Sequence, residues 1–288
     1  MPENLDDFFA EKQSIINELF IATADDNYVL ARWCFHQHLN VDFYWLAVHA
    51  LEKYLKAILL LNGRSAKSYS HNIVKLYAAA TPLAPELFPT ILIKPEDRMP
   101  DQYWHTEKVD DFIARLYRDG QADNRYQLFG YSRQPEDLWK LDQVVSAVRR
   151  ICRPLEAYEL GKPHDGAANL SNRDILGKYP QRWRMNSRLE DTMSGKRGEE
   201  LMRAALTWNF QFAPVDYKQP PVSYTSSAQN PVLVRRLYDP LEAGPAHFSH
   251  NNALWNWVKD NIQLPKTLIA EIESERDKIK AKSIASAS

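Results

Sequence analysis

Apolar residues between positions 42 and 77 recur at the three- and four-residue intervals that are typical of one face of an α-helix. A second apolar stripe runs beside the first, so little of the circumference is left polar. A helix of this kind is normally central in a bundle or shared with a partner subunit. The first stripe comprises Tyr44, Val48, Leu51, Leu55 and Ile58, and the second comprises Ala47, Ala50, Tyr54, Ala57 and Leu61.

The apolar helix is followed by a polar loop and by the start of a second helix. Asn62 and Gly63 predict the end of the first helix, since glycine readily takes the left-handed conformation of a helix C-cap. Ser70 precedes apolar residues at helical spacing and is predicted to be the N-cap of the next helix. The loop also contains Arg64 and His71, so charged and titratable side chains lie where two helices meet.

The rest of residues 1–160 also has the pattern of helices. An amphipathic helix opens the chain, and Thr23 with Asp26 three positions later resembles a capping box that begins the next helix. A cluster of prolines between residues 82 and 100 predicts a long crossover loop, because proline cannot continue a helix. Further helices are predicted at 109–117 and 138–155, with a short aromatic loop at 125–132.

The pattern changes after residue 160. Glycine and proline predict a linker at 161–166. Helical stretches at 188–210 and 253–282 are separated by a segment rich in proline, serine and tyrosine, and the last residues, 278–288, are expected to be frayed or disordered.

At 288 residues the chain has room for one large domain or two modest ones, each able to bury a core. The helical patterns indicate an all-α protein. We expect a helical bundle at residues 1–160 and a less regular, mostly helical C-terminal extension of unknown type at residues 161–288.

The overall charge sets limits on the partners. The formal net charge is −1, so any contact with nucleic acid must come from a local patch. The first residues are acidic without a hydrophobic signal segment, and the longest apolar run, 57–61, is far too short to span a bilayer. Cys34 and Cys152 resemble no metal-ligand pair and are expected to be free thiols in a reducing compartment. We expect a cytoplasmic protein with no membrane partner, no metal and no cofactor.

Two further groups of side chains are candidates for binding. One is a polar stripe on the apolar helix, which either lines a cleft or is a solvated face with helical ion pairing; we favour the solvated face. The other is a C-terminal cluster in which arginine and tryptophan interleave, as suits phosphate contact and base stacking. A solvated face or an aromatic anchor explains that cluster equally well. The stripe comprises His49, Glu52, Lys53 and Lys56, and the nucleic-acid-binding candidates are Lys178, Arg182, Trp183, Arg184 and Arg188.

Over about residues 5–158 the sequence resembles the HEPN superfamily of α-helical domains. The resemblance rests on AVHALEKYLKAILLLNG at 47–63, on SHNIVKLY at 70–77 and on a looser match from Ala24 to Arg32. RYQLFGYS stands where such domains often carry an Arg-Tyr-Gly-like element, with Gln127 in place of the glycine. The resemblance implies an up-down helical bundle that forms a homodimer.

Many HEPN domains are metal-independent endoribonucleases of toxin–antitoxin, CRISPR and antiphage-defence systems. Their nuclease branch carries an arginine followed, after four to six residues, by a histidine, and Arg64 and His71 have this spacing. The resemblance therefore implies a catalytic pair in which His71 is the general base or acid and Arg64 stabilises the phosphate. It implies RNA as the substrate and an antitoxin or defence-system protein as a further partner.

The same spacing occurs twice more, at Arg32 with His38 and at Arg98 with His105. We expect Arg32 to form salt bridges with the aspartates just before it, and Arg98 and His105 to lie in a loop. His71 also stands where a helix begins, and there a histidine can cap or pack instead of catalysing.

Two functions therefore stay open. The first is metal-independent RNA cleavage by Arg64 and His71. The second is a non-catalytic HEPN module that binds RNA, a nucleotide or a partner protein, with the function residing in the C-terminal extension. A His71 whose ring is enclosed and hydrogen-bonded to backbone would favour the second function, and a His71 that faces Arg64 in a solvent-open dimer cleft would favour the first.

Overall fold

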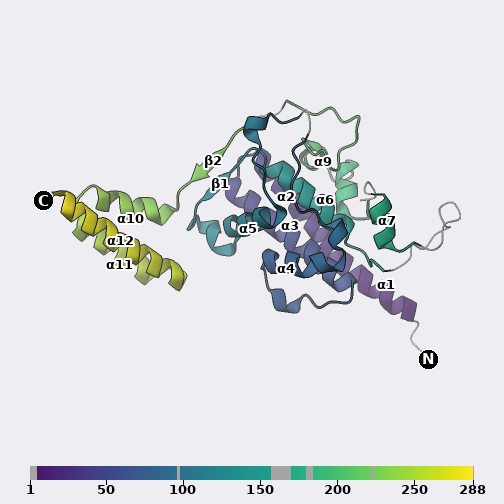
Figure 1. Ribbon diagram of the computed structural model, residues 1–288, viewed down its shortest axis with the longest axis horizontal. Helices are drawn as coiled ribbons and strands as arrows, with labels where there is room; N and C mark the ends of the chain where they lie inside the picture. The colour runs from purple at the N-terminus through teal and green to yellow at the C-terminus, as the bar shows by residue number, and fades with distance from the viewer. Residues whose placement is uncertain (1–4, 96–97, 157–169, 180–183, 222–223, 288) are drawn as a thin grey trace. The chain divides into compact units, whose positions relative to one another are not determined.

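The computed structural model describes residues 5–95, 98–156, 170–179, 184–221 and 224–287, and most of them are helical (Figure 1). The expected all-α class is therefore confirmed. Two short strands, β1 (Tyr131–Arg133) and β2 (Ser227–Gln229), pair in a two-stranded sheet. The chain divides into two compact units, which we describe separately. Unit 1 comprises residues 1–125 and 132–227, and unit 2 comprises residues 126–131 and 228–288.

Unit 1 consists of α-helices joined by loops and short 3-10 turns (Figure 1). The helix expected at 138–155 is present but ends at Arg150. The helices are α1 (Leu5–Ile16), α2 (Ala22–His36), α3 (Asn40–Leu61), α4 (Ile73–Ala80), α5 (Val109–Gly120), α6 (Asp137–Arg150), α7 (Asn172–Lys178), α8 (Arg188–Met193) and α9 (Glu199–Leu206).

The apolar helix α3 is central in unit 1, as its two stripes predict. It packs against α2, α4, α5 and α6, and its side chains at Tyr44, Leu51 and Leu55 are fully buried. The helix ends as expected, with Asn62 as the C-cap and Gly63 at a φ of 73°. The Cys152 thiol is buried at this core and donates to the carbonyl oxygen of Tyr54 at 3.4 Å.

Two predicted helix starts are wrong. A π-helical turn (Asn17–Ile21) joins α1 to α2, so the chain is helical where a capping box was expected. The Thr23 hydroxyl donates to the carbonyl oxygen of Leu19 at 2.7 Å, which lets threonine sit inside a helix. The N-cap of α4 is Asn72 instead of Ser70, because the Asn72 side chain accepts from the backbone N–H of Lys75 at 3.0 Å.

Buried ion pairs hold α8 and α9 against α2 and α6. The Arg149 guanidinium lies 2.8 Å from Asp25 Oδ1 and 2.7 Å from Glu190 Oε2; the Arg149 and Asp25 side chains are fully buried, and that of Glu190 is partly exposed. Arg32 pairs with Asp142 of α6, and its Nε donates to the carbonyl oxygen of Ala204 at 2.9 Å. The expectation that Arg32 pairs with the aspartates just before it is therefore wrong. These contacts place a segment that follows residue 160 on helices that come before it.

Unit 2 contains three described helices and also the aromatic segment 126–131. Gly130 has a φ of 68°, and a Cβ atom there would lie 2.1 Å from the carbonyl oxygen of Gln229, so this turn requires glycine. The last helix continues to Ala287, and the expectation of a frayed tail is wrong. None of the described helices of either unit is long and apolar enough to cross a membrane. The helices are α10 (Val232–Glu242), α11 (Phe248–Asn261) and α12 (Lys266–Ala287), and their core comprises Leu128, Leu237, Trp255, Val258, Leu264, Leu268 and Ile272.

Candidate functional site

His71 is bound to a carboxylate of the central helix. Its Nδ1 atom lies 3.0 Å from Oε1 and 3.1 Å from Oε2 of Glu52. The Glu52 side chain is buried, whereas the His71 side chain is 77% exposed. Because a carboxylate accepts hydrogen bonds, Nδ1 carries the proton and Nε2 is left for a ligand or a solvent molecule. This arrangement fixes the tautomer and orientation of an imidazole whose outer face is in solvent.

The predicted polar stripe of α3 supplies Glu52 and a second partner for it. Lys56 Nζ lies 2.6 Å from Glu52 Oε1, so one carboxylate holds both an imidazole and an ammonium group. Lys53 turns the other way and donates to Asn27 Oδ1 at 2.6 Å, and burial lowers the pKa of Lys53. His49 Nδ1 lies 2.8 Å from the carbonyl oxygen of Trp45, on its own helix. The stripe is therefore divided, and only Glu52 and Lys56 belong with His71.

The residue before His71 has a strained backbone. Ser70 has a φ of 50° and a ψ of −123°, and the N–H of Asn72 donates to the carbonyl oxygen of Tyr69 at 3.1 Å. These values describe a type II′ turn with Ser70 at its first central position, where glycine is preferred. A residue other than glycine in such a region costs on the order of 1–3 kcal/mol, and such residues cluster at functional sites. The turn aims His71 back at α3.

Arg64 is not part of this cluster. Its guanidinium donates to the carbonyl oxygen of Ala79 at 3.4 Å, near the C-terminal end of α4. His71 lies before the N-terminal end of the same helix, and the stretch from Ile73 to Ala79 rises roughly 9 Å. Arg64 also lines a hollow beside α1, together with Ile16. The structure thus places the two residues of the expected catalytic pair at opposite ends of α4 within one chain.

A second histidine–glutamate pair has nearly the same geometry. Nδ1 of His105 lies 2.9 Å from Oε1 of Glu136, with a His105 side chain that is 70% exposed and a Glu136 side chain that is fully buried. Glu136 Oε1 also lies 3.5 Å from Lys140 Nζ. The pairing of an exposed histidine with a buried carboxylate is therefore not by itself diagnostic of a reactive site.

The local charge distinguishes the two pairs. From residue 43 to residue 85 the sequence has five lysines and arginines and one acid, Glu52, a local charge of +4. From residue 94 to residue 111 it has three basic residues and six acids, a local charge of −3. The segment that contains His71 is therefore net basic in sequence, and the segment that contains His105 is net acidic.

The expected nucleic-acid-binding cluster is only partly described. Lys178 is exposed at the end of α7, and Arg182 and Trp183 lie outside the described residues. Arg184 is exposed, and its carbonyl oxygen accepts from Arg153 at 3.5 Å. Arg188 pairs with Asp26 of α2, which neutralises one of the expected phosphate-binding charges. The described members of this cluster therefore differ in their surroundings.

The sequence pattern missed the role of Glu52 as the partner of His71, because the contact joins residues 19 positions apart.

Comparison with known proteins adds no family: no family model matches the chain, and neither the curated proteins nor the solved structures contain a match. Within the described part of the chain, no group of three or more histidine, cysteine, aspartate or glutamate residues could hold a metal ion.

Proposed function

We propose that this chain is a HEPN-like, up-down helical protein that cleaves RNA without a metal ion, with His71 as the proton-transfer group. The observation that carries the proposal is that a buried carboxylate, Glu52, holds Nδ1 of a solvent-facing imidazole at 3.0 Å within a segment of net positive charge, which the His105–Glu136 pair lacks. A carboxylate that orients a catalytic histidine in this way is a common feature of sites that carry out general acid–base catalysis. The resemblance of residues 47–63 and 70–77 to HEPN domains supports the same reaction class.

The chemistry needs one proton acceptor and one proton donor. His71 Nε2 takes the proton of a ribose 2′-hydroxyl, whose oxygen then bonds to the adjacent phosphorus. The bond from phosphorus to the 5′-oxygen breaks, and that oxygen leaves with a proton taken from solvent. The products are a 2′,3′-cyclic phosphate and a free 5′-hydroxyl. Glu52 stabilises the imidazolium that forms when His71 accepts the proton.

The basic side chains of the same segment supply charge for RNA. Lys56 contacts Glu52 directly, and Lys67 and Lys75 are exposed in the loop and on α4, before and after His71. Each cation that neutralises a phosphate releases counterions, so binding should weaken as salt is added. In this proposal Arg64 binds a phosphate of the RNA strand that is more distant than the reacting one. An Arg64 that contacts the reacting phosphate would then have to come from a second copy of the chain. Membership of a toxin or antiphage-defence system, a homodimer and an antitoxin-like partner belong to the same proposal.

The second candidate function is a non-catalytic module that binds RNA. The position of Arg64 favours this alternative, because its guanidinium donates to the carbonyl oxygen of Ala79 and is not held beside His71 to stabilise a pentacoordinate phosphate. Under this alternative the segment from 43 to 85 still binds a polyanion through its charge. His71 would then fix the loop to α3 through Glu52.

The test is cleavage of an end-labelled single-stranded RNA in excess EDTA, with wild-type protein and His71→Ala purified in parallel. We expect wild-type protein to produce fragments that end in a 2′,3′-cyclic phosphate and His71→Ala to produce none. RNA binding by both proteins without cleavage by either would replace the nuclease proposal with the binding module. Equal cleavage by both would remove His71 from the site.

A further inference from the structure

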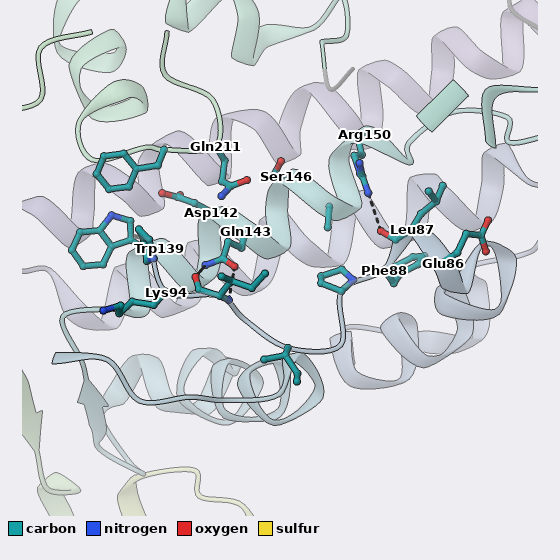
Figure 2. A pocket seen from close by; sticks show the side chains of 16 residues that line it. Glu86, Leu87, Phe88, Lys94, Trp139, Asp142, Gln143, Ser146, Arg150 and Gln211 are labelled. Atoms are coloured by element: carbon teal, nitrogen blue, oxygen red, sulfur yellow. Dashed lines mark hydrogen bonds between the residues drawn. The ribbon is translucent and has the colours of Figure 1, made fainter. Parts of the chain in front are cut away.

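A groove runs between α6 and the chain segment that precedes α5 (Figure 2). The wall opposite α6 is the proline-rich segment 86–95, and Phe210 and Gln211 close one side. The cavity has a volume of about 530 Å³, within the range of small-molecule sites. The α6 side chains that line it lie on one helical face: Trp139, Asp142, Gln143, Ser146, Ala147 and Arg150.

The groove exists because the loop is anchored at two points and is longer than the distance between them. The Gln143 side chain binds both the N–H and the carbonyl oxygen of Ile93, at 2.9 and 2.8 Å, and Arg150 donates to the carbonyl oxygen of Leu87 at 3.2 Å. From Gln143 to Arg150 the helix rises about 10 Å. The chain from Leu87 to Ile93 can span up to about 20 Å, so it bows away from α6. The small side chain of Ser146 leaves the space between α6 and this loop open.

The two ends of the groove differ in chemistry. At one end the rings of Trp139 and Phe210 are stacked, with centroids 6.2 Å apart and planes inclined by 15°. At the other end is the guanidinium of Arg150, and burial lowers the pKa of Arg150. Polar groups of Gln143 and Ser146 lie between the two ends (Figure 2). The aromatic end also has Lys94, whose ammonium group pairs with Asp101 (Figure 2). The aromatic rings and the Arg150 guanidinium together favour a ligand with an aromatic ring and an anionic group.

The acids that line the groove are neutralised by partners. Glu86 is bound by Arg173 in a bidentate pair, at 2.6 and 3.0 Å. Asp142 is fully buried and pairs with Arg32. Neither carboxylate therefore opposes a bound anion as a free charge would.

We propose that this groove binds a small aromatic carboxylate, with its carboxylate at Arg150 and its ring mainly against Phe210, because the neighbouring Trp139 is only 3% exposed. Burial of Arg150 strengthens such a contact, because an ion pair and a charged hydrogen bond are stronger away from water. The helix rises about 16 Å from Trp139 to Arg150, so the ligand must be longer than a benzoate to touch both ends. The site is separate from His71 and does not depend on the nuclease proposal.

The experiment is a titration of the full-length protein followed by ligand-observed fluorine NMR. The probe is para-fluorophenylbutyrate, and the comparison ligands are its neutral amide and the shorter para-fluorobenzoate. We expect the butyrate to bind about tenfold more tightly than the amide, which lacks the charged hydrogen bond, and than the benzoate, which is too short to touch both ends. Absence of binding, or equal binding of the butyrate and the amide, overturns the proposal.

Variants locate the bound probe. Ser146→Leu fills the cavity without touching either end, and Arg150→Gln removes the cation; each should weaken butyrate binding about tenfold or more. Arg203→Gln is the control, because Arg203 is an exposed arginine in a surface pair with Glu199 at 2.7 Å, outside this groove. Circular dichroism establishes that each variant is folded. Wild-type affinity in Ser146→Leu would place the probe elsewhere and overturn the proposal even if Arg150→Gln failed to fold.

Discussion

Nδ1 of His71 and the carboxylate of Glu52 join a loop to the central helix across 19 positions of sequence. The orientation of the His71 ring is therefore set by α3 and not only by its own loop. Because α3 is packed by four other helices of unit 1, the carboxylate is held in a rigid place. A fixed partner of this kind is what distinguishes an oriented imidazole from an ordinary surface histidine.

The role of Glu52 can be measured with Glu52→Gln. Glutamine keeps the size of the side chain and can still accept from Nδ1, but it removes the negative charge that stabilises the imidazolium. We expect single-turnover RNA cleavage to fall by about tenfold or more, and to fall less than in His71→Ala, for which a loss of about 100-fold or more is typical of a general base. Unchanged cleavage in Glu52→Gln would show that the carboxylate has no part in proton transfer.

Replacing Ser70 by glycine should make the protein more stable. Glycine adopts the φ of 50° without strain, so we expect the free energy of unfolding in urea to rise by about 1 kcal/mol. The control is Ser68→Gly in the neighbouring 3-10 turn, where φ is not positive and the added chain entropy should lower stability by a few tenths of a kcal/mol. A lower stability of Ser70→Gly than of wild type would contradict the strained-turn interpretation.

Asp25 should make stability depend on pH. Burial on its own raises the pKa of Asp25, but the charge and hydrogen bonds of Arg149 outweigh it, so the pKa of Asp25 is lowered. A carboxyl group with a lowered pKa stabilises the folded state above its unfolded pKa of about 4, and this stability is lost as pH falls. The wild type should therefore be more stable than Asp25→Asn by about 3 kcal/mol near neutral pH. The difference should shrink below about pH 4.

Urea denaturation of wild type and Asp25→Asn at a series of pH values checks this expectation. The difference between the two proteins isolates Asp25 from the other titrating groups, which are common to both. A difference that stays constant down to the lowest pH at which both proteins fold would show that folding does not lower the pKa of Asp25.

Gly120 allows α5 to lie directly on α3. A Cβ atom at Gly120 would lie 2.4 Å from the carbonyl oxygen of Tyr44 and 2.6 Å from a methyl group of Val48. Because the nearest atom is backbone, we expect Gly120→Ala to destabilise the fold by about 1–3 kcal/mol. Gly177→Ala in α7 is the matched control: nothing lies within 4 Å of its Cβ position, and alanine is the better helix former, so stability should rise slightly. Thermal unfolding of both variants gives the comparison, and equal melting temperatures would contradict the close approach.

The sequence pattern predicted correctly those features of the helices that depend only on residues close together in the sequence. The stripes of α3 and its Gly63 C-cap need only short-range periodicity and one residue with a permitted positive φ, and both are present as expected. Thr23 failed as a cap because its hydroxyl could be satisfied inside the helix by Leu19, so the helix had no need to end there. Ser70 failed because Asn72, two residues later, caps α4 instead.

Long-range contacts were beyond the local pattern. Leu128 lies within an aromatic segment that was assigned to the N-terminal bundle, yet it is buried in the core of α10, α11 and α12. Glu190 and Ala204 come from the part of the sequence after residue 160, yet they bind Arg149 and Arg32, which come before it. Pairings across such separations depend on the whole fold, and no periodicity within one segment specifies them.

The measurement that tests the central claim most directly is the rate of RNA cleavage in excess EDTA by His71→Ala and by His105→Ala. Both variants remove an exposed histidine that is bound to a buried glutamate, so any general cost of breaking such a pair is common to both. We predict that His71→Ala abolishes cleavage and that His105→Ala retains the wild-type rate. An equal rate in the two variants, or no cleavage by the wild type, would contradict the assignment of His71 as the catalytic base.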